Sequence, residues 1–195
     1  MFKLYLELGF FHIINIEAYD HILFVTMLTA VYKLKQWKNI LALVTAFTLG
    51  HSASLALSTL HIVTVPSAII EWLIVITILL TGVENLFIKT DNDMRAFTPK
   101  YWIKYGIAMI FGLIHGLGFS SYLQSMLGSE ESLAMPLFSF NLGVEFGQWI
   151  VVAIVLFLTW LVVRKLKVSR REWNLVLSGM GIGISLLLIF ERFPW

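Results

Sequence analysis

The chain has 195 residues, of which 58% are hydrophobic and 13% charged, and its mean hydropathy is +0.84. This composition excludes a soluble globular domain and predicts a membrane protein, and the net charge of only +2 gives no reason to expect a nucleic-acid partner. At about 20 apolar residues per spanning helix, the chain has room for about six helices in a single bundle over residues 1–195. Cysteine is absent, which excludes disulfides and thiolate ligands and leaves histidine, carboxylate and amide oxygen as donors to a metal.

The first two predicted elements are short. Residues 2–15 are amphipathic and aromatic, and they predict an interfacial or re-entrant helix because they are too few to span a membrane. The first spanning helix is predicted over 18–32, which is short for a full crossing, so the preceding segment is expected to supply part of the depth. Glu7 lies in the apolar start and no small-x-small cleavage site follows, so no signal peptide is predicted.

An acid and an imidazole, Asp20 and His21, stand side by side where this first spanning helix begins. An unpaired Asp deep in a membrane is penalised by about 2.5 to 3.5 kcal/mol, so these groups need partners. His12 can be such a partner on one condition. On a continuous helix at about 100° per residue it would lie roughly 180° from His21, so the helix must break near Asn15 for the two to converge.

The second and third spanning helices are predicted over 40–60 and 67–88. By i, i+3, i+4 spacing, one face of the second carries a polar strip at mid-depth made of Thr48, His51 and Ser52. Glu71, in the outer turn of the third, is interpreted either as a hydrated residue or as an acid at the opening of a path. Glu84, near the inner end, is expected to pair with Lys89, with an exit role as the alternative.

The last three spanning helices are predicted over 103–126, 136–163 and 174–190. The fourth carries His115 close to the face of a GxxxG pair, which lets a neighbouring backbone approach closely: Gly112 and Gly116. The fifth carries a second pair, Gly143 and Gly147, and one face with Asn141, Glu145 and Gln148. The sixth is apolar apart from two serines and a third pair, Gly179 and Gly183, and predicts packing rather than chemistry.

The placement of charge predicts the topology. All of the 14 lysines and arginines except Lys3 and Arg192 lie in three loops: Lys33, Lys35, Lys38; Lys89, Arg95, Lys100, Lys104; and Arg164, Lys165, Lys167, Arg170, Arg171. With six alternating helices, these loops fall on one side, and the positive-inside rule makes that side cytoplasmic. Both termini are then outside, on the side of the loop that carries Glu130 and Glu131.

A metal site follows from the buried polar residues taken together. His51, His115 and Glu145 fall in the middle or outer part of the bundle, on the side where Asp20 and His21 begin their helix. Imidazole and carboxylate together suit a divalent transition metal such as Ni, Co or Zn. Alternatives remain for single residues, because a lone membrane histidine commonly forms interhelical hydrogen bonds, and Asp20 can serve to orient a histidine instead of binding metal.

The sequence resembles the HupE/UreJ family, small bacterial membrane proteins regarded as nickel or cobalt permeases. The stretches that carry the resemblance are Tyr19-Asp20-His21-Ile22-Leu23-Phe24, Phe47-Thr48-Leu49-Gly50-His51-Ser52, His115-Gly116 and Phe140-Asn141-Leu142-Gly143-Val144-Glu145. The resemblance implies that His12, Asp20 and His21 form the family's His-spacer-Asp-His motif, and that His115 and Glu145 belong to its later polar elements. The spacer between His12 and Asp20 is longer than in the better-known members of the family. In this respect the sequence resembles a divergent second branch of the family.

These observations predict a secondary permease for a divalent transition metal in the bacterial inner membrane, surrounded by lipid and able to form a homo-oligomer. The predicted metal ligands are His12, Asp20, His21, His51, His115 and Glu145, and the predicted supporting or pathway residues are Thr48, Ser52, Glu71, Asn141 and Gln148. The alternative is an intramembrane zinc hydrolase that acts on lipid or peptide bonds, and a third hypothesis is an assembly protein whose polar cluster is purely structural.

Overall fold

The computed structural model describes residues 1–16, 19–88, 99–127 and 133–194, and the residues it describes form an all-α bundle, as predicted. The helices are α1 (Phe2–Ile14), α2 (Asp20–Thr29), α3 (Trp37–Thr59), α4 (Ser67–Phe87), α5 (Pro99–Leu127), α6 (Ala134–Trp160) and α7 (Arg170–Glu191). A short 3-10 turn, η1 (Leu34–Gln36), leads into α3, and a π-helical turn, η3 (Leu161–Lys165), extends α6.

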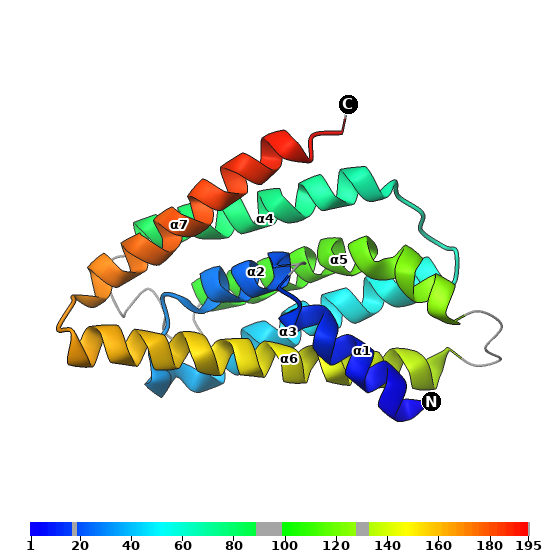
Figure 1. Cartoon of the computed structure of the whole chain (residues 1–195), viewed down its shortest axis with the longest axis horizontal. Coiled ribbons are helices and arrows are strands. Elements are labelled where there is room, and N and C mark those ends of the chain that lie inside the picture. The colour runs from blue at the N-terminus through cyan, green and yellow to red at the C-terminus, as the bar shows by residue number, and fades with distance from the viewer. Residues whose placement is uncertain (17–18, 89–98, 128–132, 195) are drawn as a thin grey trace.

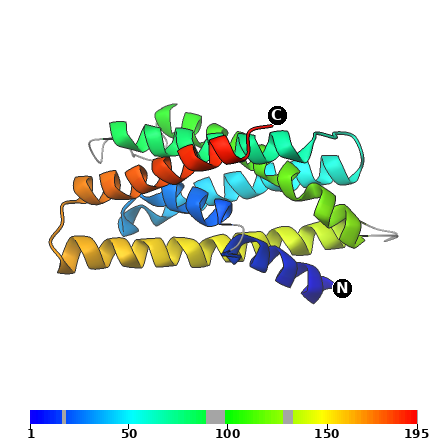
Figure 2. The same cartoon turned by 45° about the horizontal axis from the view of Figure 1, so that its top comes forward.

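Five of the described helices, α3 to α7, are long and apolar enough to cross a membrane. The predicted first spanning helix over 18–32 is not a full crossing, because α2 has 10 residues and a length of about 15 Å at 1.5 Å per residue. Figures 1 and 2 show α1 and α2 in tandem along the bundle, α1 in one half and α2 in the other. The two short helices therefore follow one another along the length of the bundle, and α2 covers only part of the helix predicted over 18–32.

The connections group at the two ends of the bundle. The α2–α3 and α6–α7 connections, with the described lysines and arginines of two predicted loops, lie at one end, here called the basic end (Figure 1). The N-terminus, the α3–α4 connection and the far end of α7 lie toward the opposite end, here called the terminal end. Lys89, Arg95, Glu130 and Glu131 lie outside the described residues, as does the side chain of Lys100.

Glycines let two pairs of helices touch through their backbones. A Cβ at Gly112 of α5 would overlap the carbonyl oxygen of Phe47 of α3, and one at Gly143 of α6 would overlap that of Leu6 of α1. These contacts confirm the predicted role of the pairs in α5 and α6. The third pair differs, because a Cβ at Gly179 or Gly183 of α7 would meet nothing within 4 Å. The close α3–α5 and α1–α6 contacts fix the helices that carry the buried histidines.

Candidate metal centre

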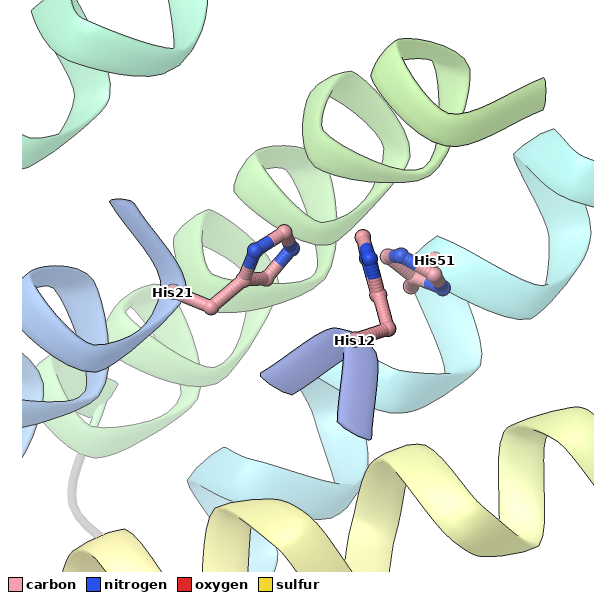
Figure 3. A group of neighbouring side chains, drawn as sticks. All are labelled: His12, His21 and His51. Atoms are coloured by element: carbon pink, nitrogen blue, oxygen red, sulfur yellow. The ribbon is translucent and has the colours of Figure 1, made fainter. Parts of the chain in front are cut away.

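Three histidines from three different helices meet at the centre of the bundle. His12 lies in the last turn of α1, His21 in the first turn of α2 and His51 in the middle of α3. Each offers a ring nitrogen, and the three nitrogens lie within 4.8 Å of one another. Figure 3 shows the ring of His12 standing between those of His21 and His51. Three converging imidazoles form an arrangement that can hold a cation.

The break between α1 and α2 makes this convergence possible. α1 ends at Ile14, and Asn15 is extended, with φ −64° and ψ 118°, so the chain leaves the helix there. It re-enters a helix at Asp20, whose negative charge in the first turn suits the positive end of the helix dipole. The rings of His12 and His21 consequently lie 4.4 Å apart between centroids. The predicted break near Asn15 is confirmed.

His12 is half-buried and the other clustered histidines are buried, and most of their ring nitrogens lack the hydrogen bonds that buried polar atoms usually have. His21 is 5% exposed, and His51 and His115 are fully buried. Within the described residues, these nitrogens have no hydrogen-bond partner: Nε2 of His12, both nitrogens of His21 and of His51, and Nδ1 of His115. Each such atom costs about 1–3 kcal/mol when nothing satisfies it, and a bound ion or water is the usual explanation for several in one place.

His115 lies beside the three-histidine group, with its ring centroid 5.3 Å from that of His21. Its Nε2 is 3.0 Å from Oγ1 of Thr77, and the Thr77 hydroxyl donates its own hydrogen to the Ile74 carbonyl at 2.7 Å. The Thr77 oxygen is therefore left to accept from an Nε2–H of His115. This tautomer keeps a lone pair on Nδ1, the nitrogen without a partner.

A cavity of about 960 Å³ leads to the histidines from the part of the bundle formed by α1, α4 and α5. Besides apolar residues, the cavity is lined by ionisable side chains that carry both signs of charge: His12, Asp20, His21, Glu71, His115 and Arg192. His12 also packs against Phe119, with the ring centroids 3.9 Å apart. Three of the four clustered histidines are therefore reachable from this cavity, here called the outer cavity, and Glu71 belongs to its lining.

Asp20 lies in the same cavity but faces a partner of its own. Its Oδ2 accepts a hydrogen bond from Nη1 of Arg192 at 2.8 Å, and its Oδ1 is buried without a hydrogen-bond partner in the described chain. Burial alone would lower the pKa of Arg192, but the hydrogen bond and the charge of Asp20, with a smaller contribution from Glu71, raise it. Arg192 is thus a fixed positive charge at the cavity wall, and it neutralises the carboxylate next to His21.

Two polar residues of α6, Glu145 and Gln148, bind α3 instead of lining the cavity. Thr45 donates to Oε1 of Glu145 at 2.8 Å, and Thr48 donates to Oε1 of Gln148 at the same distance. These two bonds join α3 to α6 side by side. Ser52 donates to the Thr48 carbonyl of its own helix, and Asn141 donates to the Leu137 carbonyl of its own helix while its side chain also lies beside His51. Glu145 accordingly lies outside the three-histidine group.

Two contributors to the site were not predicted from the sequence. Arg192 could have been noticed, since it is one of two basic residues outside the three basic loops. Thr77 gives no such signal, because threonines that bond their own helix are common in apolar helices. Glu84 pairs with Lys104, at 2.7 Å, whereas the sequence predicted Lys89, which lies outside the described residues.

Comparison with protein families gives one match, to the family described as HupE / UreJ protein, over residues 1–192. The chain belongs to the HupE/UreJ family. No curated protein and no solved structure matches the chain. The HupE/UreJ match covers both halves of the broken first crossing, the five long helices and Arg192, so the whole histidine cluster lies within the family region.

Proposed function

We propose that this HupE/UreJ protein is a secondary permease for a divalent transition metal, with nickel or cobalt as the favoured substrate. The observation that carries the proposal is a group of three imidazoles, two of them buried and that of His12 half-buried, whose ligand nitrogens lie within 4.8 Å of one another. Most of their ring nitrogens have no hydrogen bond in the described chain. His12, His21 and His51 are the proposed ligands, and His115 is a proposed fourth. The family's association with nickel and cobalt transport supports the same substrate.

The donor set supports a transition metal over magnesium or calcium. Imidazole nitrogen suits Ni, Co and Zn, whereas Mg and Ca prefer oxygen ligands. At a metal–nitrogen distance of about 2.1 Å, tetrahedral ligand nitrogens lie about 3.4 Å apart, a spacing that the three rings can reach with at most small side-chain movements. A site that closes on its ion and reopens suits transport, where binding must be strong enough to replace hydration and weak enough to permit release.

The position of the cluster supports transport over hydrolysis. The histidines meet where a crossing is broken into two half-length helices, which is where transporters commonly place their substrate sites. An intramembrane zinc hydrolase needs a general base beside the metal-bound water. Within the described chain no carboxylate joins the three-histidine group, and Asp20 is already paired with Arg192.

The proposed orientation places the basic end in the bacterial cytoplasm and both termini outside, as the positive-inside rule requires. The outer cavity then receives metal from outside the cell. The chain carries no nucleotide-binding motif, so an ion gradient would supply the energy.

Metal binding by single-site variants tests the proposal. Purified His21→Ala and His51→Ala should lose affinity for Co²⁺ by about 100-fold or more, because each removes a direct ligand and not merely an outer-shell partner. His61→Ala is the matched control, since His61 is exposed in the α3–α4 connection. Uptake of Co²⁺ into proteoliposomes should fall with the same variants. Wild-type protein that neither binds nor transports Co²⁺, Ni²⁺ or Zn²⁺ would refute the proposal.

A further inference from the structure

A second cavity of about 360 Å³ lies on the basic side of the histidines, between α2, α3, α4 and α5. It continues along the same helices, because α2, α4 and α5 line both cavities at different positions along their length. On α5, His115 lines the outer cavity and Phe111, one turn away, lines this inner cavity. The two cavities are therefore neighbours along one axis of the bundle.

Phe24 of α2 lies between the two cavities. Its ring centroid is 4.9 Å from that of His115 on the outer side and 6.1 Å from that of Phe111 on the inner side. Phe47 of α3 packs on the same ring at 4.8 Å, and both phenylalanines are fully buried. A cation that has reached the histidines thus meets a layer of aromatic carbon before the inner cavity.

The described lining of the inner cavity includes one carboxylate, that of Glu84, and this carboxylate is already paired with Lys104. Nζ of Lys104 lies 2.7 Å from Oε1 of Glu84, and both residues line the cavity. The Lys104 side chain is 10% exposed and that of Glu84 44%, so the carboxylate that lines the cavity is also accessible from the protein surface. A tethered ammonium on this carboxylate favours release, because an arriving cation must compete with it and is held only weakly.

We propose that the inner cavity is the exit half of a single cation path, closed from the histidines by Phe24 and emptied past Glu84. The inference rests on the proposed permease function and adds to it the route by which the metal leaves. Opening requires the Phe24 ring to turn away from His115, after which the divalent cation displaces Lys104 from Glu84 and passes to the basic side.

Accessibility of a single cysteine tests the barrier without any metal. The chain lacks cysteine, so Thr81→Cys places one thiol in the lining of the inner cavity. A membrane-impermeant cationic thiol reagent added on the terminal side should label it slowly. Adding Phe24→Ala, which removes the ring and leaves a void, should speed this labelling by at least about tenfold. Phe24→Leu retains bulk and should leave the labelling slow.

Further variants keep the test decisive. Glu71→Cys in the outer cavity should react from the terminal side whether or not Phe24 is replaced. If Phe24→Ala does not give a monodisperse protein, Phe24→Val replaces it and should likewise speed the labelling of Thr81→Cys. Labelling of Thr81→Cys that is already fast with Phe24 intact, or that stays slow in the Phe24→Ala or Phe24→Val background, would overturn the proposal.

Transport measurements test the exit separately from binding. Glu84→Gln should slow Co²⁺ uptake into proteoliposomes several-fold while Co²⁺ affinity in detergent stays unchanged, because the histidines are untouched. Glu7→Gln is the control, since Glu7 also pairs with a lysine, Lys3, but lines neither cavity. If Glu84→Gln does not change Co²⁺ uptake, Glu84 is not part of the exit path. Wild-type protein that binds no metal would instead refute the permease function, whatever the thiol labelling shows.

Discussion

The hydrogen bond between His115 and Thr77 determines which nitrogen of this buried imidazole keeps its lone pair. Because Thr77 donates to the Ile74 carbonyl, its oxygen can only accept, and the His115 proton is drawn to Nε2. The lone pair then stays on Nδ1. Outer-shell bonds of this kind set the tautomer and orientation of metal-binding histidines.

Thr77→Val removes this acceptor at nearly constant volume. We expect the affinity for Co²⁺ to fall about 10- to 100-fold, because His115 loses both its preferred tautomer and its fixed orientation. Thr77→Ser retains the hydroxyl and should restore binding. Thr81→Val, one turn along α4 and bonded only to the Thr77 carbonyl in the described chain, is the control. Titration followed by the visible absorption of bound Co²⁺ measures the effect, and equal affinities for Thr77→Val and Thr77→Ser would contradict it.

The carboxylate beside His21 belongs to Asp20, whose Oδ2 is paired with Arg192, and this pairing disfavours Asp20 as a ligand of the proposed site. Arg192→Gln should release Asp20, and a site that gains an oxygen ligand should accept harder cations. Mn²⁺, which is expected to compete poorly with Co²⁺ in the wild type, should then compete clearly in an equilibrium binding assay. Two variants serve as controls. Arg192→Lys keeps the charge at this position, and Arg164→Gln removes the charge of an exposed arginine at the basic end. Selectivity that does not change in Arg192→Gln would exclude this role.

At the scale of the helices, the cluster depends on how closely α3 and α5 approach. A Cβ at Gly116 would overlap the His51 carbonyl oxygen and the Ser54 hydroxyl, so the backbone of α5 rests directly on the turn of α3 that carries a proposed ligand. The same helix has Gly106, whose Cβ would meet nothing within 4 Å. One helix therefore offers a glycine that fixes the site and a glycine that does not.

Gly116→Val should push α3 away and move His51 out of reach of His12 and His21. We expect loss of Co²⁺ binding and a destabilisation of about 1–3 kcal/mol, the usual cost of overpacking, with the helical content retained. Gly106→Val should leave both properties nearly unchanged. Circular dichroism and thermal unfolding in detergent, together with the Co²⁺ titration, measure these effects. Equal binding by the two valine variants would show that the α3–α5 contact does not position the site.

For the molecule as a whole, local rules predicted the helices and the break near Asn15, because helical periodicity and the angle between His12 and His21 depend on nearby residues alone. Contacts between segments that are distant in the sequence were harder to predict. Asp20 and Arg192 are separated by 172 positions. Nothing in the spacing of α6 indicated that Glu145 would bond Thr45. The helix predicted over 18–32 was already short for a crossing, and its observed end at Thr29 could not be read from composition, which stays apolar beyond that residue.

The two ends of the bundle differ in charge, and this difference sets the expected direction of the outer cavity. Lys3 lies near the N-terminus, and Lys167 follows η3 at the basic end, both exposed. In the cysteine-free chain, Lys3→Cys should react with an impermeant thiol reagent added outside intact bacterial cells, and Lys167→Cys should react only after the membrane is opened. With that orientation, the cavity that reaches His12, His21 and His115 collects metal from outside the cell. The reverse labelling pattern would make the cavity face the cytoplasm and would turn the proposed uptake system into an exporter.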